Sequence, residues 1–171
     1  LTRSSAASDV YKRQIQTTMT IISFATLITA FITSDFSNST VFNNSHTTKP
    51  LFYKISGTWG NHEGSLLLWL LVLSLFLYFF YISSNSQNLR YRLLTVLFQQ
   101  LIITGFLLFI LFTSNPFETL YPIPNEGLGL NPILQDPALA IHPPILYFGY
   151  VGTSIIFSAS LASLISGYLG P

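Results

Sequence analysis

Four long apolar stretches alternate with polar segments along this chain. The polar segments are rich in Asn, Ser, Pro and Gly, residues that favour turns and end helices. An apolar run of about 20 residues is long enough to cross a bilayer as an α-helix, which satisfies its own backbone hydrogen bonds. The pattern therefore predicts an all-α, polytopic membrane bundle with about four spans, at residues 15–33, 66–82, 93–113 and 145–165.

The few polar residues in and beside these spans have predictable places. Ser65 precedes the second span and is predicted to be its N-cap. In the third span, Gln99 and Gln100 are expected to face protein, because an unpaired amide in lipid costs free energy. In the fourth span, small residues recur at every fourth position and form one face that another helix can approach closely: Ser154, Ser158, Ala162 and Ser166.

The composition agrees with a membrane protein and excludes several functions. Half of the 171 residues are apolar, 8% are charged, and the mean hydropathy is +0.53. The net charge is +1 and the chain has no basic stripe, so nucleic acid is not an expected partner. Because there is no cysteine, any thiol chemistry must come from a partner.

Residues 1–14, LTRSSAASDVYKRQ, share no pattern with the rest of the chain. We predict that they are a non-native or disordered leader, with a short native cytoplasmic tail as the alternative. Residues 15–171 then form one membrane domain.

The segment 127–152, GLGLNPILQDPALAIHPPILYFGYVG, holds the strongest candidate for chemistry, His142. Pro143 and Pro144 suit the first turn of a helix, which predicts that His142 lies near the N-cap of the fourth span. The positive end of a helix disfavours protonation, and neutral imidazole is a common haem ligand. From the residues alone, a histidine that merely caps its helix is the favoured alternative.

The segment TWGNHEGS, residues 58–65, is predicted to turn into the second span. It places Trp59 at a membrane interface, and Gly60 and Gly64 permit the turn. His62 and Glu63 do not form an HExxH zinc motif, because a leucine stands where the second histidine is needed. We therefore expect structural roles for this segment and no metal site in it.

Three further residues are weaker candidates. Asp136 is placed to accept a hydrogen bond from an imidazole, although an aspartate that binds its own turn is the favoured alternative. Lys49 and Lys54 are candidates for contacts with haem propionates, and anchoring at the interface explains them equally well. His46 lies in an Asn- and Thr-rich loop and is predicted to be solvated surface.

Three segments, TWGNHEGSLLLW (58–69), LLFILFTSNPF (107–117) and 127–152, closely resemble the N-terminal part of the CcmF family, in the family's order. This family comprises the haem lyase components of the cytochrome c maturation system, and the resemblance covers about residues 23–167. In the family, a histidine in a His-Pro-Pro run ligates haem. The resemblance implies that His142 is a haem axial ligand, that haem iron is the only metal, and that no residue of this chain is itself catalytic.

The resemblance also implies a function. The chain would be part of a lyase that receives haem and positions it for thioether bonding to the CxxCH thiols of apocytochrome c. The family's tryptophan-rich WWD segment and second external histidine do not occur in this sequence, so we expect an N-terminal fragment that is inactive without them. The expected partners are membrane lipid, the WWD-containing remainder of the same protein, a haem chaperone, thiol-handling maturation components and apocytochrome c.

Location and orientation are also implied by the resemblance, because Lys and Arg are equally frequent in the two kinds of loop. We expect the bacterial inner membrane or the mitochondrial inner membrane, with two external loops, 34–64 and 114–144, and with Arg90 and Arg92 inside. The alternative function is a transporter or respiratory-complex subunit without haem ligation. Such a subunit should have charged residues within its spans, and the predicted spans have none.

Overall fold

The computed structural model describes residues 3–168, and this part of the chain folds into helices joined by loops. Four of its helical stretches are long and apolar enough to cross a membrane. This confirms the prediction of an all-α, polytopic bundle. The elements are α1 (Arg3–Thr33), α2 (Ser39–Asn44), α3 (Leu51–Gly57), α4 (His62–Ser83), α5 (Leu89–Thr113), the 3₁₀ helix η1 (Pro132–Leu134), α6 (Pro137–Tyr150) and α7 (Thr153–Ser166).

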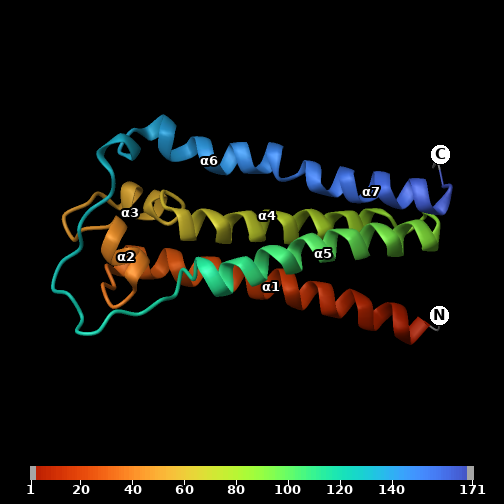
Figure 1. Ribbon diagram of the computed structural model, residues 1–171, viewed down its shortest axis with the longest axis horizontal. Helices are drawn as coiled ribbons and strands as arrows, with labels where there is room; N and C mark the ends of the chain where they lie inside the picture. The colour runs from red at the N-terminus through yellow and green to blue at the C-terminus, as the bar shows by residue number, and fades with distance from the viewer. Residues whose placement is uncertain (1–2, 169–171) are drawn as a thin grey trace.

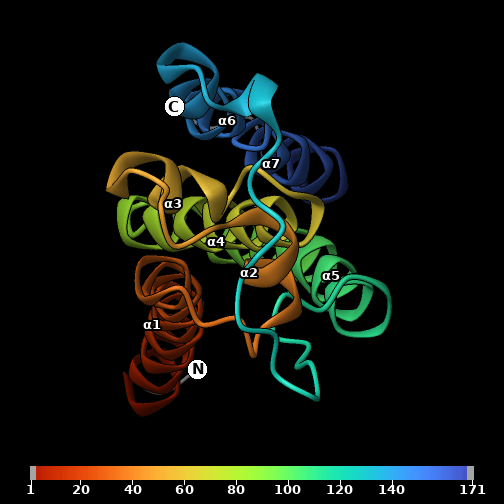
Figure 2. The ribbon, with the colours of Figure 1, turned by 90° about the vertical axis from the view of Figure 1, so that its left-hand side faces the viewer.

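Helix α4 lies at the centre of the bundle (Figures 1 and 2). It contacts α1 on one side and α5, α6 and α7 on the others. Its side chains are apolar around most of the helix, which suits an element surrounded by protein. The core consists of residues from α4 and the helices that face it, including Leu27, Phe31, Val72, Leu73 and Leu77.

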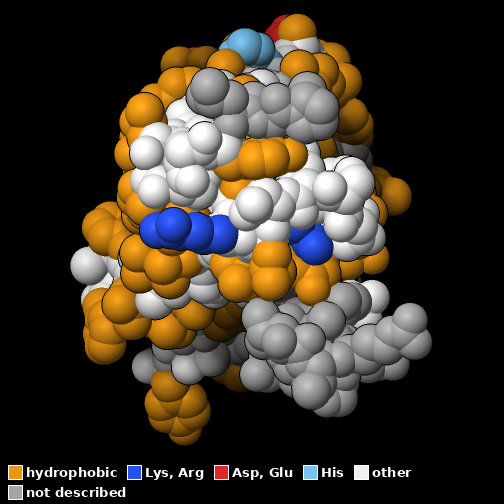
Figure 3. All heavy atoms as spheres, turned by 90° about the vertical axis from the view of Figure 1, so that its right-hand side faces the viewer, with side chains coloured by type: hydrophobic (Ala, Val, Ile, Leu, Met, Phe, Trp, Pro, Cys, Tyr) orange, Lys and Arg blue, Asp and Glu red, His pale blue; other side chains and the backbone are white. Residues whose placement is uncertain are grey.

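The two ends of the bundle differ in structure. The loop end contains α2, α3 and the long segment 114–136, whereas the turn end contains the α4–α5 connection (Figure 1). Within residues 14–168, every carboxylate and every histidine lies between residues 35 and 63 or between residues 118 and 142, in or next to these loops. Arg90 and Arg92 belong to the turn end, where Figure 3 shows the basic side chains. His62 and His142 therefore share one end and Arg90 the other, while the side of the membrane stays a prediction.

Helix α4 begins four residues before the predicted span, at His62 instead of residue 66. Its N-cap is Asn61, whose side-chain oxygen accepts a hydrogen bond of 2.7 Å from the Gly64 amide. The prediction that Ser65 is the cap was wrong. The Ser65 hydroxyl donates instead to the Trp59 carbonyl at 2.7 Å, because an asparagine four positions earlier already satisfies the helix end.

The fourth spanning stretch begins at Pro137, not at residue 145. Asp136 is its N-cap, and one carboxylate oxygen accepts from the amides of Ala138 and Leu139 at 2.8 and 3.0 Å. An aspartate followed by proline is a strong helix start signal, and this pair precedes the His-Pro-Pro run in the chain. The prediction that His142 lies at an N-cap was therefore wrong, since it lies within α6.

This stretch is also interrupted between α6 and α7, at Val151 and Gly152, which are both buried. A Cβ atom on Gly152 would stand 2.5 Å from the Phe148 carbonyl oxygen and 2.7 Å from the Phe76 ring. Glycine is therefore required there chiefly by the Phe148 carbonyl of α6, and the Phe76 ring of α4 lies almost as close. The span is two helices in tandem, where the sequence predicted one.

Helices α5 and α7 pack along the small-residue face. The Gln99 side-chain amide is fully buried: it donates to the Ser154 hydroxyl at 3.0 Å and accepts from the Ser158 hydroxyl at 3.0 Å. Ser158 and Ala162 are both 0% exposed. The prediction that Gln99 faces protein is confirmed, whereas Gln100 is half-buried.

The predicted leader is residues 1–14; residues 1 and 2 lie outside the described residues, and residues 3–14 are the start of helix α1, ahead of its membrane-spanning part, Gln14–Thr33. Helical backbone does not test the origin of that segment, which stays a prediction. Likewise α5 begins at Leu89, so that Arg90 and Arg92 lie in its first turn instead of before it. Arg92 there donates to the Ser84 hydroxyl, the Tyr81 carbonyl and the Asn85 side chain.

Candidate functional site at the loop end

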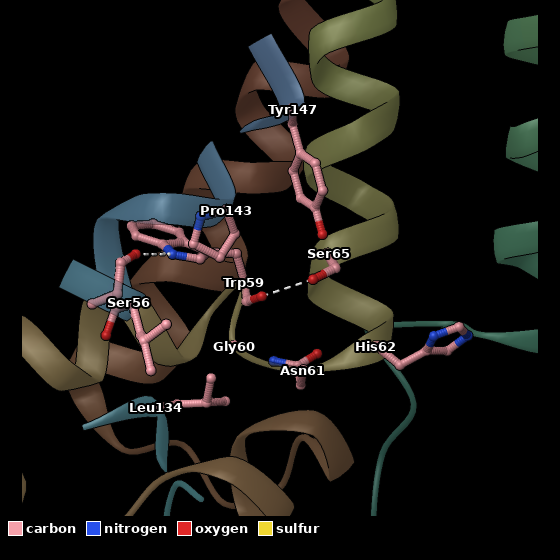
Figure 4. A pocket seen from close by; sticks show the side chains of 11 residues that line it. Ser56, Trp59, Gly60, Asn61, His62, Ser65, Leu134, Pro143 and Tyr147 are labelled. Carbon is pink, nitrogen blue, oxygen red and sulfur yellow. Dashed lines mark hydrogen bonds between the residues drawn. The ribbon is translucent and has the colours of Figure 1, made fainter. Parts of the chain in front are cut away.

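A cavity of about 460 Å³ lies at the loop end, where the two motif segments meet (Figure 4). Segment 58–65 contributes Trp59, Asn61 and His62 to its lining, and α6 contributes Leu139, Pro143 and Tyr147. Leu134 of η1 lies across from them. Residues about 80 positions apart in sequence thus form one site, because the second and fourth spanning stretches both begin at the loop end.

Segment 58–65 is held tightly against the start of α4. The Asn61 side chain donates to the Gly57 carbonyl at 2.7 Å and accepts from the Gly64 amide. A Cβ atom on Gly64 would overlap the Thr58 carbonyl group, so only glycine fits there. Gly60 is less constrained, because its nearest atom would be 3.2 Å away.

Trp59 connects this segment to α6. Pro144 has no backbone N–H, so the carbonyl of Ala140 lacks its usual donor four residues later. The Trp59 indole N–H donates to that carbonyl at 2.8 Å. The indole ring also stacks on Phe24 of α1, with ring centroids 6.4 Å apart. The predicted interface tryptophan is therefore a cross-link between three helical segments.

His142 lies on α6 beside the cavity, and its side chain is exposed. Its neighbour Pro143 lines the cavity, but His142 does not. Within the part of the chain that the structure describes, the imidazole has no hydrogen-bond partner, and both ring nitrogens are available. The Asp136 carboxylate does not reach the imidazole, because it accepts from amides of its own helix. This is the alternative that the sequence favoured, an aspartate bound to its own turn.

The other residues of the predicted site are dispersed around the loop end. The His62 ring points away from the cavity (Figure 4) and lies 3.1 Å from the Ser114 hydroxyl. Glu63 is half-buried in the first turn of α4, where a negative charge is favourable. Lys54 donates to the Ser34 hydroxyl at 2.6 Å, Lys49 is half-buried, and neither lysine lines the cavity.

Among the described side chains of residues 14–168, no group of three or more His, Cys, Asp or Glu residues is placed to hold a metal ion. His142 is the histidine whose ring is both exposed and free of other bonds, whereas His46 and His62 each have a hydroxyl partner.

Sequence reasoning missed a polar cluster that ties the two loops together. Glu126 accepts from the Thr47 hydroxyl at 2.6 Å and from the Thr47 amide at 3.0 Å, and His46 lies 3.8 Å away. The hydroxyl bond, followed by the amide bond, lowers the pKa of Glu126 from 4.5 to about 2. The partners are 79 residues apart, so no local pattern could have indicated them. His46 is half-buried in this cluster, where solvated surface was predicted.

Comparisons with known proteins find relatives over most of this chain. A family model described as "Cytochrome C assembly protein" matches residues 59–169. The biogenesis protein CycK of Rhizobium meliloti (strain 1021) is 54% identical over 147 residues, which are 85% of this chain and 21% of that protein.

Two other relatives match a stretch of similar length. The biogenesis protein ccl1 of Rhodobacter capsulatus is 53% identical over 148 residues, 85% of this chain and 22% of the relative. CcmF of Escherichia coli (strain K12) is 48% identical over 147 residues, 85% of this chain and 23% of the relative. The chain thus spans little more than a fifth of the length of these relatives. No solved structure matches it.

Proposed function

Because the chain belongs to the cytochrome c assembly protein family, we propose that it is the N-terminal membrane part of a cytochrome c haem lyase. It is an integral membrane protein that acts in cytochrome c maturation. In the proposed role it helps to receive haem from a chaperone and to position it for attachment to apocytochrome c. The proposed location is the bacterial inner membrane or its mitochondrial counterpart.

The observation that supports this function most directly is the state of His142. Its imidazole is exposed at the loop end, and no described residue occupies its nitrogens. A free neutral imidazole is a suitable axial ligand of haem iron, so the donor chemistry fits the cofactor. The helix that presents it begins at a capped end and is tied to α4 through segment 58–65. In the proposed role, His142 would bind the haem iron from this chain, and a second ligand would come from the remainder of the protein.

The chain's own part in the reaction is binding and orientation. When bound, haem supplies the carbon atoms that the apocytochrome thiols join in thioether bonds. In the proposed role this chain holds the cofactor at a fixed place and angle, and the thiols come from a partner, because the chain has no cysteine. The described residues at the loop end keep α6 in register with α4 and thereby fix the position of His142.

The test uses the full-length protein in a cytochrome c maturation system, with His142→Ala as the variant. We expect loss of the external haem spectrum and of holocytochrome c. His142→Gly should be partly restored by added imidazole, which can occupy the vacated coordination position. His62→Ala is the matched control, because it removes a loop-end histidine that already has a hydroxyl partner. A wild-type haem spectrum and normal holocytochrome c in His142→Ala would refute the assignment.

A further inference from the structure

The described part of α6 contains two consecutive prolines in its interior, Pro143 and Pro144. Each removes the N–H that would bind the carbonyl four residues earlier, so the carbonyls of Leu139 and Ala140 lose their helical donors. His142 lies between these weakened positions and the prolines. Its orientation therefore depends on whatever else holds this turn.

The Ala140 carbonyl is shielded from water, since Ala140 is only 4% exposed. A buried carbonyl without a donor is strongly unfavourable, and here the donor is the Trp59 indole, at 2.8 Å. Trp59 comes from a segment 81 residues earlier in the chain. One indole N–H thus replaces the backbone donor that Pro144 removes.

Trp59 is itself fixed from several directions. Its ring stacks on Phe24, its carbonyl accepts from the Ser65 hydroxyl at 2.7 Å, and its amide donates to the Ser56 carbonyl at 3.2 Å. A side chain held in this way can set the position of what it binds. Through Trp59, the position of the α6 turn that presents His142 is fixed relative to α1 and α4, and not only by its own helix.

We propose that Trp59 is a positioning residue for His142: its indole N–H compensates for Pro144 and fixes the turn that presents the imidazole. This inference rests on the proposed role of His142 as a haem ligand. It predicts that Trp59 is needed to position His142 only as long as residue 144 is a proline.

The test compares Trp59→Phe, Pro144→Ala and the double variant in the full-length protein. Trp59→Phe keeps an aromatic ring and removes the donor, whereas Pro144→Ala returns an amide N–H to the helix. Trp69→Phe is the matched control: Trp69 also packs against α6, through Tyr147 and Tyr150, but among the described residues its indole N–H makes no hydrogen bond to that helix. The first measurement is amide hydrogen exchange at residues 140–142 in haem-free protein. The second is the haem spectrum.

We expect Trp59→Phe to speed exchange at residues 140–142 by roughly 5- to 30-fold, the effect of losing one or two kcal/mol. It should also change the haem spectrum while His142 is intact. The double variant should recover both, and Trp69→Phe should change neither. Unchanged exchange in Trp59→Phe, or no recovery in the double variant, would overturn the proposal.

The haem-free measurement separates this inference from the proposed function. If exchange responds as expected but His142→Ala keeps its haem, the proposed ligand is wrong and the coupling of Trp59 to α6 stands. If His142→Ala loses haem but Trp59→Phe alters neither exchange nor the spectrum, the ligand stands and Trp59 has no positioning role.

Discussion

Replacing Ser158 with leucine should destabilise the bundle at the α5–α7 contact. Ser158 is 0% exposed, and its hydroxyl donates to the Gln99 side-chain oxygen at 3.0 Å. Leucine adds volume where none is free, which costs about 1 to 3 kcal/mol. Loss of the hydrogen bond to Gln99 adds about 0.6 to 1.7 kcal/mol in a membrane interior. The sum is about 1.6 to 4.7 kcal/mol, or a roughly 15- to 3,000-fold lower ratio of folded to unfolded protein.

The assay is unfolding of the purified protein in detergent, together with its accumulation in membranes. Two variants separate the terms. Ser158→Ala removes only the hydroxyl and should cost only the hydrogen bond, about 0.6 to 1.7 kcal/mol. Phe157→Leu changes a side chain that is 58% exposed on the neighbouring face and should be nearly neutral. If Ser158→Leu unfolds like the wild type, α5 and α7 do not pack through this face.

Other predictions concern the loop end and the orientation. Gly64→Ala should destabilise the protein by about 3 kcal/mol and reduce its accumulation, because its Cβ would overlap a carbonyl group, whereas Gly105→Ala, where space is open, should be tolerated; equal effects would contradict this. The depressed pKa of Glu126 means that its contribution to loop stability is fully present above pH 4.5 and is lost as the pH falls through about 2. The backbone amide that donates to Glu126 should then lose its protection from hydrogen exchange, and constant protection across this range would show that the carboxylate is not what holds it. With Arg90 and Arg92 inside, a membrane-impermeant thiol reagent should label Asn125→Cys and spare Asn88→Cys in intact cells, and the reverse pattern would invert the orientation.

The spans were predictable because long apolar runs determine them locally. The first was placed at residues 15–33 and lies at Gln14–Thr33. The buried face of α7 was predictable for a similar reason, since a spacing of four places small residues on one side. In each case the information lies within a single helix.

The details of the site were less accessible to sequence reasoning. The start of α6 was missed because Asp136 and Pro137 form a start signal before the His-Pro-Pro run does. The placement of His142 at an N-cap rested on the rule that a proline inside a helix is unfavourable. That rule fails here because Trp59 supplies a donor from 81 residues away. A donor that comes from so far along the chain cannot be recognised from the residues around Pro144.

The buried Gln99 amide also has a consequence for the order of biosynthesis. Its partner Ser154 lies 55 residues further along the chain, so α5 leaves the ribosome before the hydroxyls that satisfy it exist. At about 5 to 20 residues per second, that interval is roughly 3 to 11 seconds. During this time Gln99 must be tolerated in an otherwise apolar helix or be held away from lipid by the insertion machinery. The arrival of α7 then supplies the hydroxyls of Ser154 and Ser158 and removes the unpaired amide from the nascent chain.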